Sequence, residues 1–338
     1  MKKVFVLILV VAMAFSAFAQ GQTDATANYP NRSLLLIVPF GAGGATDLIA
    51  RATQPKMEEI LGQPLAVQNM PGGASAIGNE YVMDQPHDGY TILCEPTDIV
   101  SIAVMGQSSL TYKDWSMIGV AASVPGVICV NPKSEIKTIE QLTEIMKTKK
   151  LVASSSDVGC AFTRCCALYC NQLGLTLPEF VPSGGGYNAA VSAMKGEVDI
   201  SLCGLPECIE LIRGGELVPL AYFGNDDVDA GNGITVRAIG KVYPGLADYL
   251  PFGGWVGMAV PADTPQSIKD KLIDAYRQAC SDSSVQSFFA SKTFIPVNFF
   301  GADADAYVKT SSQLNAYIMY DLGFTKTDPA TVGIERLN

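Results

Sequence analysis

A recurring arrangement of a buried strand, a glycine-rich turn and a helix start most constrains what this 338-residue chain can fold into. It occurs at 40–47, 154–162 and 182–188. The apolar run 34–40 before the first turn is typical of a strand buried on both faces, and Gly-Gln-Pro at 62–64 ends the helix that follows. Alternating strands and helices with short connections predict an α/β fold with parallel sheets of the βαβ type.

These turns bring backbone donors to the ends of strands. The first N–H groups of a helix have no partner inside the helix, and the helix dipole adds partial positive charge. Glycine lets a ligand approach the main chain closely, and no lysine or arginine lies inside the three turns. Three such turns predict a site in which the main chain holds a small carboxylate. Asp47, in the first helical turn, is either an ordinary cap and dipole partner, or a functional residue that orders the loop or meets a donor on the ligand.

Spacing excludes two nucleotide-binding functions of glycine-rich turns. A P-loop needs Gly-Lys-Ser/Thr, and none follows Gly41. A dinucleotide fingerprint needs glycine where Thr46 stands. No cofactor is therefore expected.

Enzymatic function has weak support in the sequence. His87 is the only histidine and lies in a Pro-His-Asp-Gly turn, where polar residues are ordinary. No G-x-S-x-G elbow occurs. Cys160 lies beside a predicted helix start, a position that favours a reactive thiolate, so a thiol-dependent hydrolase stays as a minor alternative. A packing or ligand-lining role is favoured for Cys160, and the chain is not expected to be an enzyme.

The nine cysteines give no metal-binding pattern. No C-x-x-C pair occurs, so no zinc site is expected. Cys166 and Cys170, four positions apart, share one face if their segment is helical. Small buried side chains, with one or two disulfides, are the expected state, and the odd number leaves at least one thiol unpaired.

The N-terminus has the pattern of a cleavable secretory signal. Lys2 and Lys3 precede the apolar run 4–15, and Ser-Ala-Phe-Ala at 16–19 predicts cleavage after Ala19. Losing the two lysines shifts the formal net charge from −10 to about −12, so nucleic acid is not an expected partner. These features predict a periplasmic protein.

Short motifs along the whole mature chain resemble the Bug-type receptors of tripartite tricarboxylate transporters. The motifs lie at 39–47, 50–51, 61–64, 69–72, 77–78, 88–93, 196–199, 204–206, 214–217, 255–258 and 261–265. No single motif is decisive, but their order and spacing together are specific.

The resemblance implies a two-lobed periplasmic binding protein of the type II-like, Venus flytrap kind. Lobe I would comprise 28–122 and 252–338, and lobe II would comprise 123–251. It further implies a monomeric receptor that closes on a small carboxylate and delivers it to the membrane permease subunits of the transporter. Use of the same receptor for signalling is an alternative that the sequence leaves open.

Site residues can be carried over from the family by position. The implied contacts from lobe I are Phe40, Gly41, Ala42, Gly43, Gly44, Thr46, Asp47, Ser75 and Thr97. Those from lobe II are Ser155, Ser156, Gly159, Cys160, Ala161, Ser183, Gly185, Gly186, Cys203 and Gly204.

Several positions depart from the family pattern. Asp157 and Cys160 replace a small residue and a hydroxyl residue, Thr163 a frequent histidine, Ser183 a frequent tyrosine, and Cys203 an aspartate of some relatives. A carboxylate at Asp157 opposes an anionic ligand unless it turns away from the site. These departures leave the identity of the ligand open.

Overall fold

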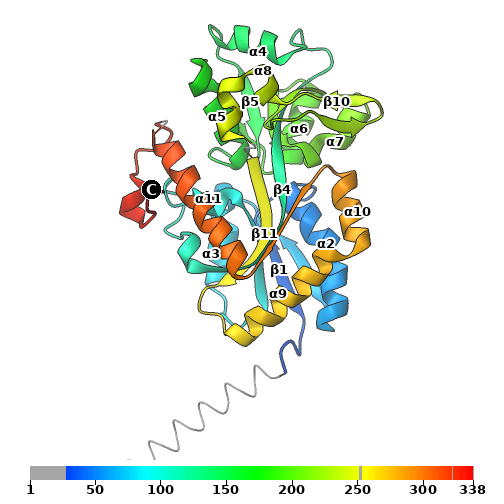
Figure 1. Ribbon diagram of the computed structural model, residues 1–338, viewed down its shortest axis with the longest axis vertical. Helices are drawn as coiled ribbons and strands as arrows, with labels where there is room; N and C mark the ends of the chain where they lie inside the picture. The colour runs from blue at the N-terminus through cyan, green and yellow to red at the C-terminus, as the bar shows by residue number, and fades with distance from the viewer. Residues whose placement is uncertain (1–27, 251–252, 322, 338) are drawn as a thin grey trace, which may run out of the picture.

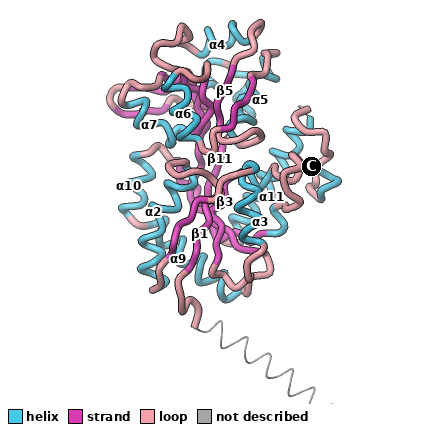
Figure 2. The backbone as a smooth tube through the Cα atoms, turned by 180° about the vertical axis from the view of Figure 1, so that it is seen from behind, coloured by secondary structure: helices cyan, strands magenta, loops and turns pink. Residues whose placement is uncertain are grey.

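The computed structural model describes residues 28–250, 253–321 and 323–337. The predicted signal peptide, 1–19, lies outside the described residues. The elements form a lower and an upper half, and the strands β4 and β11 run through the junction between them (Figure 1). Seen from behind, the strands form a central layer with helices on its flanks (Figure 2).

Strands and helices alternate along most of the chain. The strands are β1 Leu34–Val38, β2 Leu65–Asn69, β3 Thr91–Pro96, β4 Trp115–Val130, β5 Val152–Ser155, β6 Glu179–Pro182, β7 Ile200–Gly204, β8 Val218–Tyr222, β9 Val228–Gly231, β10 Ile234–Val236, β11 Gly253–Pro261 and β12 Ile295–Phe300. The helices are α2 Ala45–Leu61, α3 Ala76–Met83, α4 Ile139–Met146, α5 Ala161–Leu173, α6 Gly186–Lys195, α7 Leu205–Arg213, α8 Ile239–Val242, α9 Gln266–Ser281, α10 Ser283–Ser291 and α11 Ala302–Asp321. Short 3₁₀ helices lie at Gly73–Ser75, Thr97–Val100, Tyr112–Asp114, Pro244–Tyr249 and Pro329–Val332.

Parallel pairing, as predicted, occurs at both ends of the main sheet. The strand order is β2-β1-β3-β11-β4-β7-β5-β6, with β12 and β8 also paired to β4. The sets β2-β1-β3 and β7-β5-β6 are parallel. The central strands β11 and β4 instead pair antiparallel with each other and with their neighbours. The sheet is therefore mixed, because its two central strands carry the chain between the halves in opposite directions.

The strand β4 changes partners along its length. Its first part, Trp115–Pro125, pairs with β11 of the lower half. From Gly126 to Val130 it pairs with β7 and β8 of the upper half. The division into lobes at 122/123 and 251/252 stays a prediction, and its second boundary falls on residues that are not described.

Local signals explain how the first helix begins and ends. Helix α2 follows Gly44, continues through Pro55 as one element, and ends at Gly62, whose φ of 67° is left-handed. Glycine adopts this conformation without steric cost, and the Gly62 N–H donates to the carbonyl of Glu58. The turn predicted to end this helix is confirmed.

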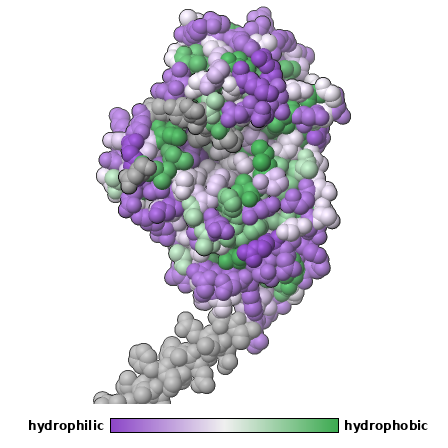
Figure 3. Space-filling view, viewed as in Figure 1, coloured by the Kyte–Doolittle hydropathy of each residue, from purple (hydrophilic) through white to green (hydrophobic). Residues whose placement is uncertain are grey.

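One core joins the two halves. Buried apolar side chains from both halves, including Leu36, Ile92, Ile128 and Leu202, belong to a single cluster. On the face shown in Figure 3, hydrophilic residues dominate the two ends of the molecule, and apolar residues gather toward its middle. Among the described residues, no helix is both long enough and apolar enough to span a membrane.

The acidic, glycine-rich segment 225–233 is not simply a loop, because it contains β9 and enters a hairpin with β10, with Val236 paired to Val228. One or two disulfides were expected, but the structure shows none among the described residues. All nine cysteines are buried, so their prediction as small core side chains is confirmed.

Candidate ligand-binding cavity

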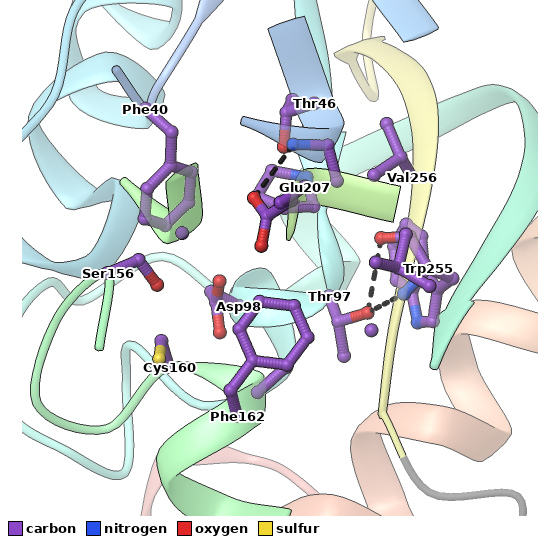
Figure 4. Close-up of a pocket in the computed structure, with 16 residues that line it drawn as sticks. Phe40, Thr46, Thr97, Asp98, Ser156, Cys160, Phe162, Glu207, Trp255 and Val256 are labelled. Carbon is purple, nitrogen blue, oxygen red and sulfur yellow. Dashed lines mark hydrogen bonds between the residues drawn. The ribbon is translucent and has the colours of Figure 1, made fainter. Parts of the chain in front are cut away.

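A narrow cavity lies where four helices begin, at the junction of the two halves (Figure 4). The first residues of α2 come from the lower half, and those of α5, α6 and α7 from the upper half. The cavity is lined by Phe40, Ala45, Thr46, Pro96, Thr97, Asp98, Val124, Ser156, Cys160, Ala161, Phe162, Gly186, Glu207, Gly254, Trp255 and Val256. The volume open to the centre of a water molecule is only about 30 Å³, room for about two waters.

Seven of the predicted site residues line this cavity. They are Phe40, Thr46, Thr97, Ser156, Cys160, Ala161 and Gly186. They come from all three predicted turns and from the end of β3. The structure therefore brings together the turns that the sequence singled out.

The other predicted residues do not line the cavity. They are Gly41, Ala42, Gly43, Gly44, Asp47, Ser75, Ser155, Gly159, Ser183, Gly185, Cys203 and Gly204. Several shape the turns: the Gly41 N–H donates to the Gly184 carbonyl at 3.0 Å, which joins the two halves, and the Ser183 N–H donates to the Ser155 carbonyl. Cys203 instead belongs to the apolar core beneath α7.

Asp47 orders the first turn. Its carboxylate accepts from the Gly43 N–H at 2.9 Å, the Arg51 Nε at 2.9 Å and the Asn69 Nδ2 at 3.0 Å. Burial acts to raise the pKa of Asp47, but the hydrogen bonds from Arg51, Gly43 and Asn69 together lower it. Of its two predicted roles, the structure shows the one that orders the loop.

Glu207 is one of the nine lining residues that the sequence prediction did not include. It lies in the first turn of α7, and its Oε2 accepts from the Gly204 N–H at 2.6 Å. Its Oε1 accepts from the Ala45 N–H of α2, in the other half, at 2.8 Å. Burial raises the pKa of Glu207 to about 7, although the bonds from Ala45 and Gly204 favour the ionised form and oppose the rise.

A glycine makes room for this carboxylate. A Cβ atom on Gly186 would lie 1.8 Å from the Glu207 Oε2 and 2.5 Å from Oε1. No real side chain tolerates such a contact, so the start of α6 and the Glu207 carboxylate fit only because position 186 is glycine.

Asp98, which lines the cavity, forms a buried ion pair with Arg164. The Arg164 Nη1 of α5 lies 3.1 Å from the Asp98 Oδ1, and the two side chains are 3% and 5% exposed. The same nitrogen donates to the Ser101 Oγ and the Gly159 carbonyl, both at 2.7 Å. Burial raises the pKa of Asp98, while Arg164 opposes the rise.

Asp157 also joins the halves and does not point into the cavity. Its Oδ2 accepts from the Ala74 N–H, beside the start of α3, at 2.8 Å. This geometry resolves the conflict expected between Asp157 and an anionic ligand, because the carboxylate is held by a backbone donor outside the cavity lining.

The structure does not join Cys160 and His87. The Cys160 Sγ is buried and lies 3.1 Å from the Ser155 Oγ. His87 contacts Asp263 and the Met83 carbonyl instead. Across the described residues, His, Cys, Asp and Glu side chains form no group of three or more that could hold a metal ion.

Comparison with known proteins gives the family. A family model described as tripartite tricarboxylate transporter family receptor matches residues 49–323. A UPF0065 protein from the TAR-I ttuE-ttuC' intergenic region of Agrobacterium vitis is 28% identical over 298 residues, which cover 87% of this chain and 83% of the relative.

Solved structures show the same fold. The periplasmic binding protein BugD superposes with a TM-score of 0.80 at 23% identity, covering 88% of this chain and 99% of that one. MatC from Rhodopseudomonas palustris, solved with bound malate, gives 0.78 at 21% identity, covering 86% and 99%. The predicted periplasmic-binding-protein fold is thus confirmed, and the chain belongs to the receptor family of the tripartite tricarboxylate transporters.

Proposed function

We propose that this protein is a periplasmic receptor that binds a small carboxylate in the junction cavity and delivers it to the permease subunits of a tripartite tricarboxylate-type transporter. The observation that carries the proposal is the convergence of the starts of α2, α5, α6 and α7 on one cavity. Each helix start presents backbone N–H groups and partial positive charge, which favours an anion. The bound malate of MatC supports a carboxylate as the ligand class.

Ligand entry requires the halves to separate. The cavity has room for about two waters, whereas even the smallest dicarboxylate has six non-hydrogen atoms, and the Gly41–Gly184 hydrogen bond joins the halves. The change of partners in β4 at Pro125 and Gly126 gives the chain a place to bend without breaking the pairing within either half. We infer hinge motion about this point, with the halves as the moving lobes.

An enzyme is not proposed for this cavity. Cys160 is the nucleophile that the sequence offered, but its neighbours are Ser155 and Thr163, and neither supplies a base. A binding role needs only the donors and the shape described above.

The test follows thermal unfolding of the mature protein against di- and tricarboxylates, amino acids and aromatic acids. A ligand at 100 times its Kd stabilises the native state by about 2.7 kcal/mol, which raises the midpoint by roughly 5 °C or more. The variant Ala161→Leu fills the cavity and should abolish the shift, whereas Ala66→Leu, at an exposed position of β2 outside the lining, should retain it. A protein that no small solute stabilises would contradict the proposal.

A further inference from the structure

A carboxylate of the protein, that of Glu207, already occupies the position most suited to a ligand carboxylate. Glu207 accepts hydrogen bonds from the starts of both α2 and α7, through Ala45 and Gly204. It is 8% exposed and lines the cavity. Gly186 leaves the space that the carboxylate fills. In Figure 4, Glu207 lies beside Thr46 at the α2 end of the cavity.

The rest of the lining adds a second carboxylate and no cation. Asp98 lines the cavity beside Phe162, and its partner Arg164 lies outside the lining residues. None of the lining residues given above is lysine, arginine or histidine. Above about pH 7, where Glu207 is ionised, a ligand carboxylate placed beside it would therefore meet a like charge in a poorly hydrated space, without a side-chain counter-charge.

The other two helix starts also lie beside carboxylates of the protein. The Ala161 N–H at the start of α5 donates to Asp98, and Gly186 at the start of α6 lies against the Glu207 carboxylate. The end of the cavity at Glu207 and Asp98 therefore offers hydrogen-bond acceptors to a ligand. Phe40, Phe162 and Trp255 offer apolar surface to a short carbon chain.

We propose that Glu207 is a specificity-determining residue that selects ligands with one carboxylate and, at the other end, a hydrogen-bond donor such as an ammonium or amide group. The donor end meets the carboxylates of Glu207 and Asp98, and the carboxylate end of the ligand lies away from both. A second carboxylate on the ligand is disfavoured because Glu207 takes its place. This inference rests on the proposed receptor function and narrows its ligand class.

The test uses probes that differ only in one end group. Succinate, succinamate and 4-aminobutanoate share a carboxylate and chain length but end in a carboxylate, an amide or an ammonium group. Isothermal titration calorimetry gives the Kd of each, together with glutarate, glutaramate and 5-aminopentanoate as longer homologues. The native protein should bind the best donor-bearing probe at least tenfold more tightly than the matching dicarboxylate.

Variants separate the role of Glu207 from general effects. In Glu207→Gln the preference should fall at least tenfold, with the dicarboxylate gaining affinity. Glu207→Ala, which frees both backbone donors, should shift the preference between the probes in the same direction. It replaces the glutamine variant if that variant folds poorly. Glu210→Gln, on the exposed face of the same helix, is the matched control and should keep the native preference.

The possible outcomes distinguish failure of this inference from failure of the proposed receptor function. A native protein that binds a di- or tricarboxylate most tightly, with Glu207→Gln leaving the preference unchanged, overturns this inference and leaves the receptor function standing. A protein that binds none of these probes and nothing in the wider panel overturns both.

Discussion

Adding one methyl group at Gly186 should expel the Glu207 carboxylate from the start of α2. The new Cβ would lie 1.8 Å from Oε2 and 2.3 Å from Cδ, so the carboxylate must move. It is the end of a flexible side chain, but the N–H groups of Ala45 and Gly204 hold it. The cost of Gly186→Ala is therefore the cost of breaking these two hydrogen bonds.

The expected loss of stability in Gly186→Ala follows from the two broken hydrogen bonds and from two effects that partly compensate for them. A hydrogen bond to a charged group contributes about 1.5–3 kcal/mol, so the gross loss is about 3–6 kcal/mol. Alanine recovers about 1 kcal/mol because it is a better helix former than glycine, and release of a poorly solvated carboxylate to water recovers more. We expect a net loss of about 2 kcal/mol in the free energy of unfolding, or roughly 4 to 6 °C in the midpoint.

The neighbouring glycine is the matched control. Gly185 has extended backbone, with φ of 177°, and its added Cβ would lie 3.6 Å from the Gly41 Cα, an ordinary contact. Gly185→Ala should therefore stay within about 0.5 kcal/mol of the native protein. Thermal and urea unfolding of both variants give the difference. Equal stabilities, or a Gly186→Ala penalty that persists in a Glu207→Ala background, would refute the reasoning.

Three further predictions concern buried ionisable groups. The native pKa of Glu207 is about 7, above its ordinary 4.5, so between these pH values the native state holds a proton that the unfolded chain releases. The free energy of unfolding should therefore fall by up to about 3 kcal/mol as the pH rises from 4.5 to 7. In urea titrations, Glu207→Gln should flatten this dependence. Asp98→Asn leaves Arg164 buried without its counter-charge and should cost about 3–5 kcal/mol by urea unfolding, whereas Glu140→Gln, which breaks an exposed pair, should cost under about 1 kcal/mol. All nine cysteines are buried, so a thiol reagent should modify none in the native protein and all nine after denaturation; rapid native labelling of one thiol would contradict this.

Turns and helix boundaries were predictable because their signals are local. Gly62 ends α2 in the left-handed conformation that glycine favours. The apolar run at 34–40 is largely β1, and the turn after it leads directly into α2. The strand β12 and the helix α10 were not predicted. The register of β12 is set by pairing with β4 at distant positions such as Ala122, which local spacing does not reveal.

Site residues were predictable from the sequence only where a single turn determines their position. Cys203 was assigned to the cavity by position, but successive residues of a strand face opposite sides. Its neighbour Leu202 faces the main core, and Cys203 packs with Cys208 beneath α7. Glu207 carries a local signal as well, since an acidic residue in the third helical position is a usual cap. That signal predicts its bond to Gly204, but not its bond to Ala45, which lies 162 residues away.

Several carboxylates of the protein make contacts between the two halves. Glu207 and Asp157 accept from backbone donors at Ala45 and Ala74, and Asp98 pairs with Arg164. A ligand shifts an equilibrium only by its difference in affinity for the two states. The contacts between the halves are the same whichever solute is bound, so they do not distinguish one solute from another. Selectivity must therefore come from what the cavity accepts beside Glu207.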